Sequence, residues 1–141
     1  MKQTVQSKII ILLSALLILC LVSCGESKTD FWEDAIYTED TTLGTGEKTI
    51  TVTVVAEEKT VVFTINTDKM TLGDALVEHQ LVEGEQGDYG LYIKSVNGMR
   101  ADYEKDGCYW SIAIGEESAM TGADGIEIQN GGVYTLACVK G

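Results

Sequence analysis

The side chains best suited to covalent or acid–base chemistry in this chain are four cysteines and a single histidine. A nucleophilic site of the Cys–His or Ser–His–acid kind would need His79 as its base. His79 instead continues an apolar helical stripe with Leu72, Ala75 and Leu76, which favours a packing role at the end of a helix. The chain also has no G-x-S-x-G nucleophile motif. We therefore expect a protein that is not an enzyme.

Two loops have spacings similar to those of ion-binding motifs. The stretch Asp102–Gly107 has oxygen ligands at alternate positions followed by glycine, but the twelfth position is Ala113, where calcium loops require a bidentate acid. The stretch Gly44–Thr49 has the glycines and lysine of a phosphate loop, but Glu47 separates them and no strand precedes it. We predict an acidic turn at Asp102–Gly107, no metal site and no required cofactor.

The N-terminus has the layout of a secretory signal. Lys2 and Lys8 precede an apolar run over residues 9–22 that only Ser14 interrupts. A transmembrane anchor is the alternative, but this run of 14 residues is shorter than the ~20 residues that span a bilayer. The pattern therefore favours export over a membrane span.

The end of this run, Leu21-Val22-Ser23-Cys24, resembles the lipobox of bacterial lipoproteins. The resemblance implies a lipoprotein signal peptide over residues 1–23 and a lipid, such as palmitate, on the thiol of Cys24. It also implies an extracytoplasmic protein that is anchored to the cell membrane by this lipid.

The charge of the remaining chain limits its partners. Two of the 10 basic residues lie in the signal, so residues 24–141 carry 8 basic and 22 acidic side chains, a balance of −14. An acidic surface repels phosphate backbones and anionic lipids. We expect no nucleic-acid partner, and a membrane link that comes from the lipid chains alone.

Two cysteines remain for the folded part of the chain. Cys20 leaves with the signal and Cys24 is the expected lipid site, so Cys108 and Cys138 are left. Outside the cytoplasm such a pair can form a disulfide. The alternative is two buried thiols that pack as small apolar side chains.

Residues 24–48 read as an acidic flexible tether. The stretch is rich in acids, Thr, Ser and Gly and has little apolar surface to bury. Its aromatic and aliphatic residues are Phe31, Trp32, Ile36 and Tyr37. They are interpreted as scattered side chains of a disordered linker, with docking to a partner or folding back onto the domain as alternatives.

The folded domain is expected over residues 49–141. Alternation of β-branched residues predicts a hairpin of two strands, at residues 49–54 and around 61–65. Thr71 can cap a helix that begins at Leu72, with Asp74 three residues on. Three further strands are predicted at residues 91–96, 109–114 and 133–139, with a tight turn at Asn97-Gly98 and loops at Gly84–Gly87 and Gly115–Gly132.

This order indicates an α+β fold of the β-grasp type, with one helix packed on a mixed five-stranded sheet and the last strand beside the first. If the last two strands are antiparallel with Ile114 opposite Gly132, Cys108 lies opposite Cys138 and both point to one side. In that register a disulfide between the two cysteines is geometrically feasible.

Several blocks within residues 71–140 resemble the transcobalamin-like C-terminal domain. They occur in the order of that family over about 70 residues, and with the first hairpin they cover nearly the whole folded domain. The blocks are Thr71–Leu76, Tyr92–Gly98, Ala101-Asp102-Tyr103, Gly107, Tyr109-Trp110-Ser111, Ala119–Asp124 and Gly132–Leu136.

The resemblance implies a β-grasp-like domain that closes one side of a corrinoid-binding cleft, whose other side is a helical barrel domain that this chain lacks. It implies that Trp110 and Ile112 lie near a ligand, and an aromatic face stacks well on a planar ligand. Packing of both side chains under the helix is the alternative, and either Tyr109 or Trp110 faces that helix. Further candidate contacts, on flanking loops, are Tyr89, Leu91, Met120 and Gly122.

Together these features predict a membrane-tethered binding lipoprotein that captures cobalamin, another corrinoid or another small soluble ligand. It would present the ligand to a transporter or to a separate ligand-binding domain, at the high local concentration that a tether provides. The alternative is a cell-surface interaction module that binds another protein and no small ligand.

Overall fold

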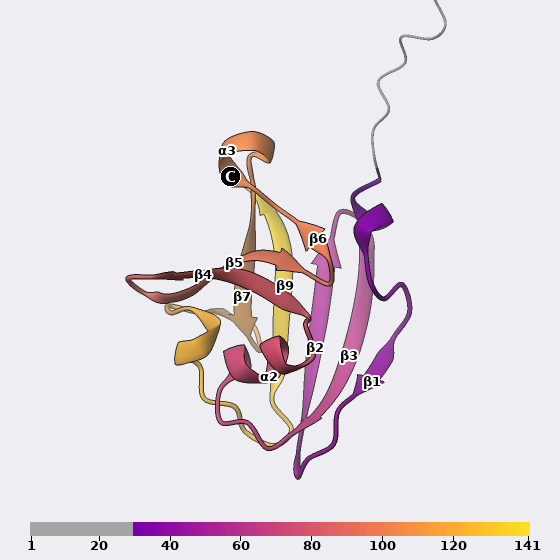
Figure 1. Cartoon of the computed structure of the whole chain (residues 1–141), viewed down its shortest axis with the longest axis vertical. Coiled ribbons are helices and arrows are strands. Elements are labelled where there is room, and N and C mark those ends of the chain that lie inside the picture. The colour runs from indigo at the N-terminus through magenta and orange to yellow at the C-terminus, as the bar shows by residue number, and fades with distance from the viewer. Residues whose placement is uncertain (1–29) are drawn as a thin grey trace, which may run out of the picture.

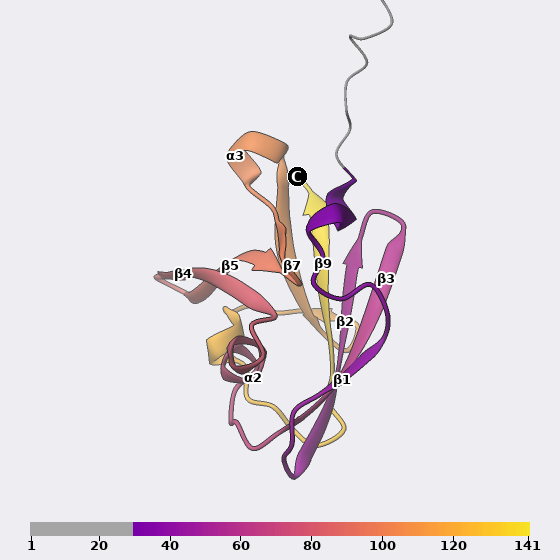
Figure 2. The same ribbon diagram turned by 45° about the vertical axis from the view of Figure 1, so that its right-hand side comes forward.

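The computed structural model describes residues 30–141, which form two packed layers (Figures 1 and 2). The larger layer is a six-stranded mixed sheet with the strand order β1-β3-β2-β9-β7-β8. Within it β1 is parallel to β3 and β9 is parallel to β2, while the other neighbours are antiparallel. Its strands are β1 (Thr41–Leu43), β2 (Lys48–Ala56), β3 (Lys59–Thr67), β7 (Cys108–Ile114), β8 (Glu117–Ser118) and β9 (Val133–Lys140).

The hairpin of β2 and β3 forms because alternate residues of both strands are apolar and β-branched or aromatic. Ile50, Val52 and Val54 of β2 and Phe63 and Ile65 of β3 are at most 1% exposed, and all point to the same face of the sheet. The threonines between them, Thr51, Thr53 and Thr64, are only half-buried. This face supplies much of the core, and the second layer covers it.

The second layer contains one helix and a small antiparallel sheet of β4 (Val82–Gly87), β5 (Gly90–Val96) and β6 (Met99–Arg100). Helix α2 (Leu72–Glu78) begins as predicted, since the Thr71 hydroxyl accepts a hydrogen bond from the Asp74 backbone N–H at 3.2 Å. Figure 1 shows β4 and β5 running across the face of the main sheet with α2 beside them. Within residues 30–141 no helix is both long and apolar enough to cross a membrane.

The predicted α+β class is confirmed, and the last strand does lie beside the first strand of the hairpin. The expected five-stranded sheet is wrong, because the main sheet has six strands and β4, β5 and β6 form a second sheet of their own. The stretch Gly84–Gly87, expected as a loop, belongs to β4. That strand buries only Val82, so it lacks the apolar alternation that identifies a strand in a sequence.

The expected tether does not extend through residues 30–48. The 3-10 helix η1 (Phe31–Asp34) places Trp32 in the core at 6% exposure, where its indole N–H donates to the Ala56 carbonyl at 3.0 Å. Tyr37 packs edge-on against Phe63 with ring centroids 5.5 Å apart. Folding back onto the domain, left above as an alternative, is therefore what the aromatic residues do, because burial of their large apolar surface outweighs the polar composition around them.

The remaining segments are short. The predicted acidic turn at Asp102–Gly107 contains one helical turn, α3 (Tyr103–Asp106), capped by Asp102 and closed by Gly107 at a φ of 66°. A second 3-10 turn, η2 (Ala123–Gly125), lies in the glycine-rich connection between β8 and β9. The predicted tight turn joins β5 to β6, with Asn97 and Gly98 both at positive φ.

Candidate functional site

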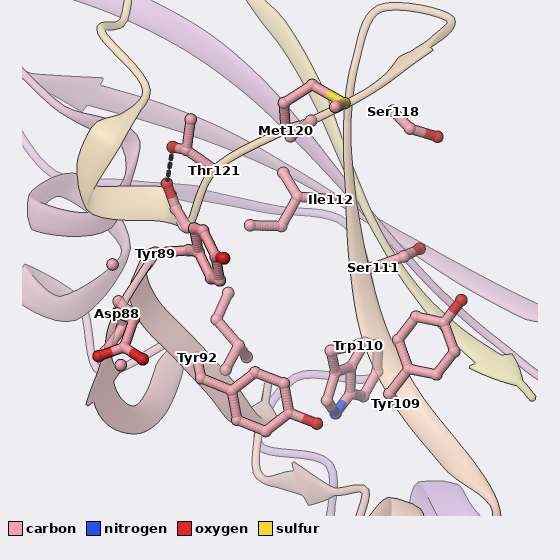
Figure 3. A pocket seen from close by; sticks show the side chains of 16 residues that line it. Asp88, Tyr89, Tyr92, Tyr109, Trp110, Ser111, Ile112, Ser118, Met120 and Thr121 are labelled. Carbon is pink, nitrogen blue, oxygen red and sulfur yellow. Dashed lines mark hydrogen bonds between the residues drawn. The ribbon is translucent and has the colours of Figure 1, made fainter.

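An open cleft of about 590 Å³ lies where the two layers meet. Three segments that are distant in sequence form it: the tip of the β4–β5 hairpin, the middle of β7 and the loop after β8. Figure 3 shows their side chains arranged around one open space, with Tyr89 and Tyr92 on the hairpin side and Trp110 and Ile112 on the β7 side.

All six residues predicted as ligand contacts line this cleft, although they come from segments up to 33 residues apart. They are Tyr89, Leu91, Trp110, Ile112, Met120 and Gly122. The structure thus brings the whole predicted set together. It also adds residues that sequence reasoning missed, chiefly Tyr92 and Tyr109, whose alternation with apolar neighbours along β5 and β7 was the available signal.

The floor of the cleft is part of the core. Trp110 is 5% exposed, and its indole N–H donates to the Met99 carbonyl at 3.2 Å, while Tyr109 is 37% exposed. Trp110 is therefore the residue of the pair that faces the second layer. The two interpretations of Trp110 are compatible, because its ring packs against Phe31, with centroids 6.0 Å apart, and also lines the cleft.

The rim, in contrast, is apolar and exposed. Tyr89 is 86% exposed and Met120 is 91% exposed, with Tyr92 at 48%. Single exposed apolar side chains are common, but a group of them around one concave surface marks a binding surface. The Lys94 ammonium lies 5.2 Å from the centroid of the Tyr92 ring, so this rim ring already accepts a cation.

One carboxylate connects the two sides of the rim. The Asp124 side chain accepts hydrogen bonds from the Leu91 backbone N–H at 2.7 Å and from the Gln86 side-chain amide at 3.2 Å. The Leu91 hydrogen bond, followed by that of Gln86, lowers the pKa of Asp124 below its ordinary value of 3.8. Asp124 therefore remains charged at neutral pH and ties the hairpin tip to the loop after β8.

Glycines permit the close approach that this connection needs. Gly90 has a φ of 105°, and a Cβ there would meet the Asp124 carboxylate. A Cβ on Gly122 would lie 2.6 Å from the Leu91 nitrogen, and the Gly122 N–H donates to the Tyr89 carbonyl at 2.9 Å. The geometry gives Gly122, predicted as a ligand contact, a second role in joining the two sides of the rim.

The two cysteines do not face each other as the predicted register required. Cys108 lies opposite Lys140, and Cys138 lies opposite Trp110, so the register differs by two residues from the expected one. A shift of two residues leaves each side chain on the same face of the sheet. Both thiols therefore still point to one side, as diagonal neighbours. Both are free and half-buried in the structure.

The other predicted sites are distributed over the fold. His79 ends helix α2, and its Nε2 atom is buried 3.8 Å from a Glu78 carboxylate oxygen without a hydrogen-bond partner. Within residues 30–141 no three His, Cys, Asp or Glu side chains cluster as metal ligands would. Cys24, the predicted lipid site, lies outside the described residues.

Comparison with known proteins gives one family and one fold. Residues 70–136 match the family model described as a domain of unknown function, DUF4430. A crystal structure from Ruminococcus gnavus, described as a "putative metal binding protein", is 38% identical to this chain with a TM-score of 0.64. The match covers 67% of this chain and 99% of that one. No curated protein matches the sequence.

Haptocorrin, solved in complex with Cbi, shares the fold of this chain with a TM-score of 0.50 at 19% identity. The match covers 70% of this chain but only 26% of haptocorrin, so the chain spans about a quarter of that protein. The expected likeness to the transcobalamin-like fold is confirmed at this level, while the β-grasp assignment itself stays a prediction.

Proposed function

Since this chain belongs to the family of the Ruminococcus gnavus protein and matches the DUF4430 model over residues 70–136, we propose that it is a binding protein whose cleft takes a small, planar ligand of the corrinoid type. The observation that carries this proposal is the convergence of three distant segments on one concave surface with a buried tryptophan floor and an exposed Tyr–Met rim.

The cleft suits one face of such a ligand. Its volume of about 590 Å³ lies within the ~300–1,000 Å³ of small-molecule sites, and aromatic rings line it on two sides. The cleft is open, so a bound corrinoid would keep one face accessible. A transporter or a separate ligand-binding domain can cover that face, which agrees with the small share of haptocorrin that this chain represents.

Charge selects among candidate ligands. Asp88 is the one acidic or basic side chain lining the cleft, and residues 24–141 carry a balance of −14. Long-range repulsion therefore disfavours anionic ligands and favours neutral or cationic ones. Metal binding, suggested by the description of the Ruminococcus gnavus protein, has less support at this cleft because Asp88 is its single carboxylate.

The proposal includes the membrane anchor expected from the sequence. A lipid on Cys24 would hold the domain outside the cell at the membrane surface and present the ligand at high local concentration. The alternative is a protein-docking module that uses the same rim as its interface. Exposed Tyr and Met side chains also suit protein partners.

Titration of the full chain in detergent with cobinamide and with cobalamin, followed by calorimetry, tests the proposal. Met120→Ala removes the most exposed rim side chain and should weaken binding about three- to tenfold, through the loss of part of the burial free energy of a methionine. Met70→Ala is the matched control, since Met70 is 66% exposed but lies outside the cleft.

No heat of binding up to millimolar corrinoid would overturn the corrinoid proposal. A stoichiometric protein partner recovered from membranes, lost in Met120→Ala and retained in Met70→Ala, would favour the docking module instead.

A further inference from the structure

A second large cavity, of about 890 Å³, shares no residue with the cleft. Residues at the start of β7 and the end of β9 line it. Figure 1 shows these two strand ends close to the C-terminus. Cys108 and Cys138 both line this cavity, beside the turn that joins β2 to β3. Its other lining residues are Asp30, Phe31, Glu57, Glu58, Lys59 and Lys140.

We propose that Cys108 and Cys138 form a two-thiolate site for a soft metal ion, with Cu(I) as the ion that fits it best. The proposal rests on the position of the two thiols and does not use the cleft or its ligand.

Strand register places the thiols close together without placing them opposite each other. Cys138 pairs with Trp110, two residues beyond Cys108 on the same strand, so the cysteines are diagonal neighbours on one face. Diagonal Cα atoms in a sheet are about 7–8 Å apart, whereas a disulfide needs about 4.4–6.8 Å. An ion between two sulfur atoms spans a wider gap than a direct S–S bond, so this geometry favours bridging by a metal.

The sulfur atoms already interact. Burial, followed by the charge of Cys108 and a hydrogen bond with it, raises the pKa of the Cys138 thiol to about 11. The Cys108 thiol donates weakly to the Asp106 carbonyl at 3.5 Å.

The donor set selects the ion. Thiolates are soft ligands that prefer Cu(I), and Cu(I) is stable with two of them. A structural zinc ion wants four ligands, and the one histidine of the chain, His79, lines no part of this cavity. Binding forms two Cu–S bonds and releases the two thiol protons to solvent, with no change in oxidation state.

The test uses the full chain with Cys20→Ala and Cys24→Ala, so that Cys108 and Cys138 are its only thiols. The chain is purified in detergent, reduced and titrated without oxygen with Cu(I) against a chromophoric chelator. We expect one ion per chain, an ultraviolet thiolate-to-copper band, loss of both reagent-accessible thiols and tighter binding as pH rises. Zn²⁺ should compete poorly.

Cys108→Ser and Cys138→Ser should each abolish stoichiometric binding while thermal unfolding shows that the domain still folds. Met70→Ala removes an exposed sulfur outside the cavity and should change nothing. Copper binding that survives both serine variants, or a disulfide between Cys108 and Cys138 in the chain isolated without reductant, would overturn the proposal.

Discussion

At the scale of single residues, Asp124 links two of the segments that form the cleft. Its carboxylate joins the hairpin tip to the loop after β8 through Leu91 and Gln86. The Gly122 N–H, which donates to the Tyr89 carbonyl at 2.9 Å, joins the same two sides through the backbone.

Asp124 also makes the stability of the rim depend on pH. Its pKa is lowered in the folded protein, so the charged form stabilises the fold fully above its unfolded pKa of about 3.8. That stabilisation is lost as pH falls through the lower folded value. Asp124→Asn keeps a carbonyl oxygen for the Leu91 N–H but cannot titrate.

We therefore expect Asp124→Asn to reduce the acid dependence of unfolding below about pH 4, as measured by denaturant titrations across pH. Asp124→Ala should lower the free energy of unfolding by about 1 kcal/mol at neutral pH and weaken ligand binding. Identical pH profiles for the wild type and Asp124→Asn would contradict this role. The pKa of Asp30 is also lowered, by its hydrogen bond with the Trp32 N–H. Asp30 is present in both the wild type and Asp124→Asn, so it contributes equally to the two pH profiles.

At the scale of elements, the segment η1 to β1 is a structural part of the domain. Trp32 fills the core and hydrogen-bonds to Ala56, and the buried Asn97 side chain accepts from the Tyr37 N–H at 2.9 Å and donates to its carbonyl at 2.8 Å. A composition rich in acids and glycine concealed this, because the few large apolar residues decide whether the segment packs.

Trp32→Ala tests whether this segment is a packed part of the domain or a flexible tether. The observed packing predicts a loss of about 3–5 kcal/mol in the free energy of unfolding, as for other buried aromatic truncations. Ile36→Ala is the control in the same segment, and we expect a change within about 0.5 kcal/mol because Ile36 is 57% exposed. Equal, small effects of both substitutions on urea unfolding would show that residues 30–48 act as a tether after all.

At the scale of the whole molecule, the packing of residues 30–48 on the domain leaves a shorter stretch of chain for the expected tether. Only six peptide units separate Asp30 from Cys24, which allows at most about 21 Å between them. A domain whose lipid lies this close would stay next to the membrane. The flexible tether of residues 24–48 predicted from the sequence would allow a larger distance between the domain and the membrane.

If hand-over to a membrane partner depends on this closeness, a longer linker should reduce it. Inserting about 24 Gly-Ser residues after Gly25 should lower ligand uptake by cells about tenfold, since effective concentration falls roughly as the −3/2 power of linker length. Ligand binding by the purified chain should not change. Unaltered uptake would show that the tether does not limit hand-over, and full activity of a secreted Cys24→Ala form would show that no anchor is needed.

Local patterns in the sequence predicted much of the fold. The hairpin of β2 and β3, the cap at Thr71 and the turn at Asn97-Gly98 depend on neighbouring residues, and all three are confirmed. Elements without a local apolar pattern were missed. β1 and β8 are too short to show alternation, and β4 exposes nearly all its side chains, so partner strands define them.

The candidate site shows the same division. The sequence by itself predicted six residues of the cleft, and three of them, Trp110, Met120 and Gly122, lie in the blocks that resemble the transcobalamin-like family. Only the tertiary structure decided that Trp110 rather than Tyr109 faces inward, that Asp124 holds the rim and that the cysteines are diagonal. Each of these depends on strand register and on contacts between distant segments, and a shift of one or two residues in register changes them without changing any local pattern.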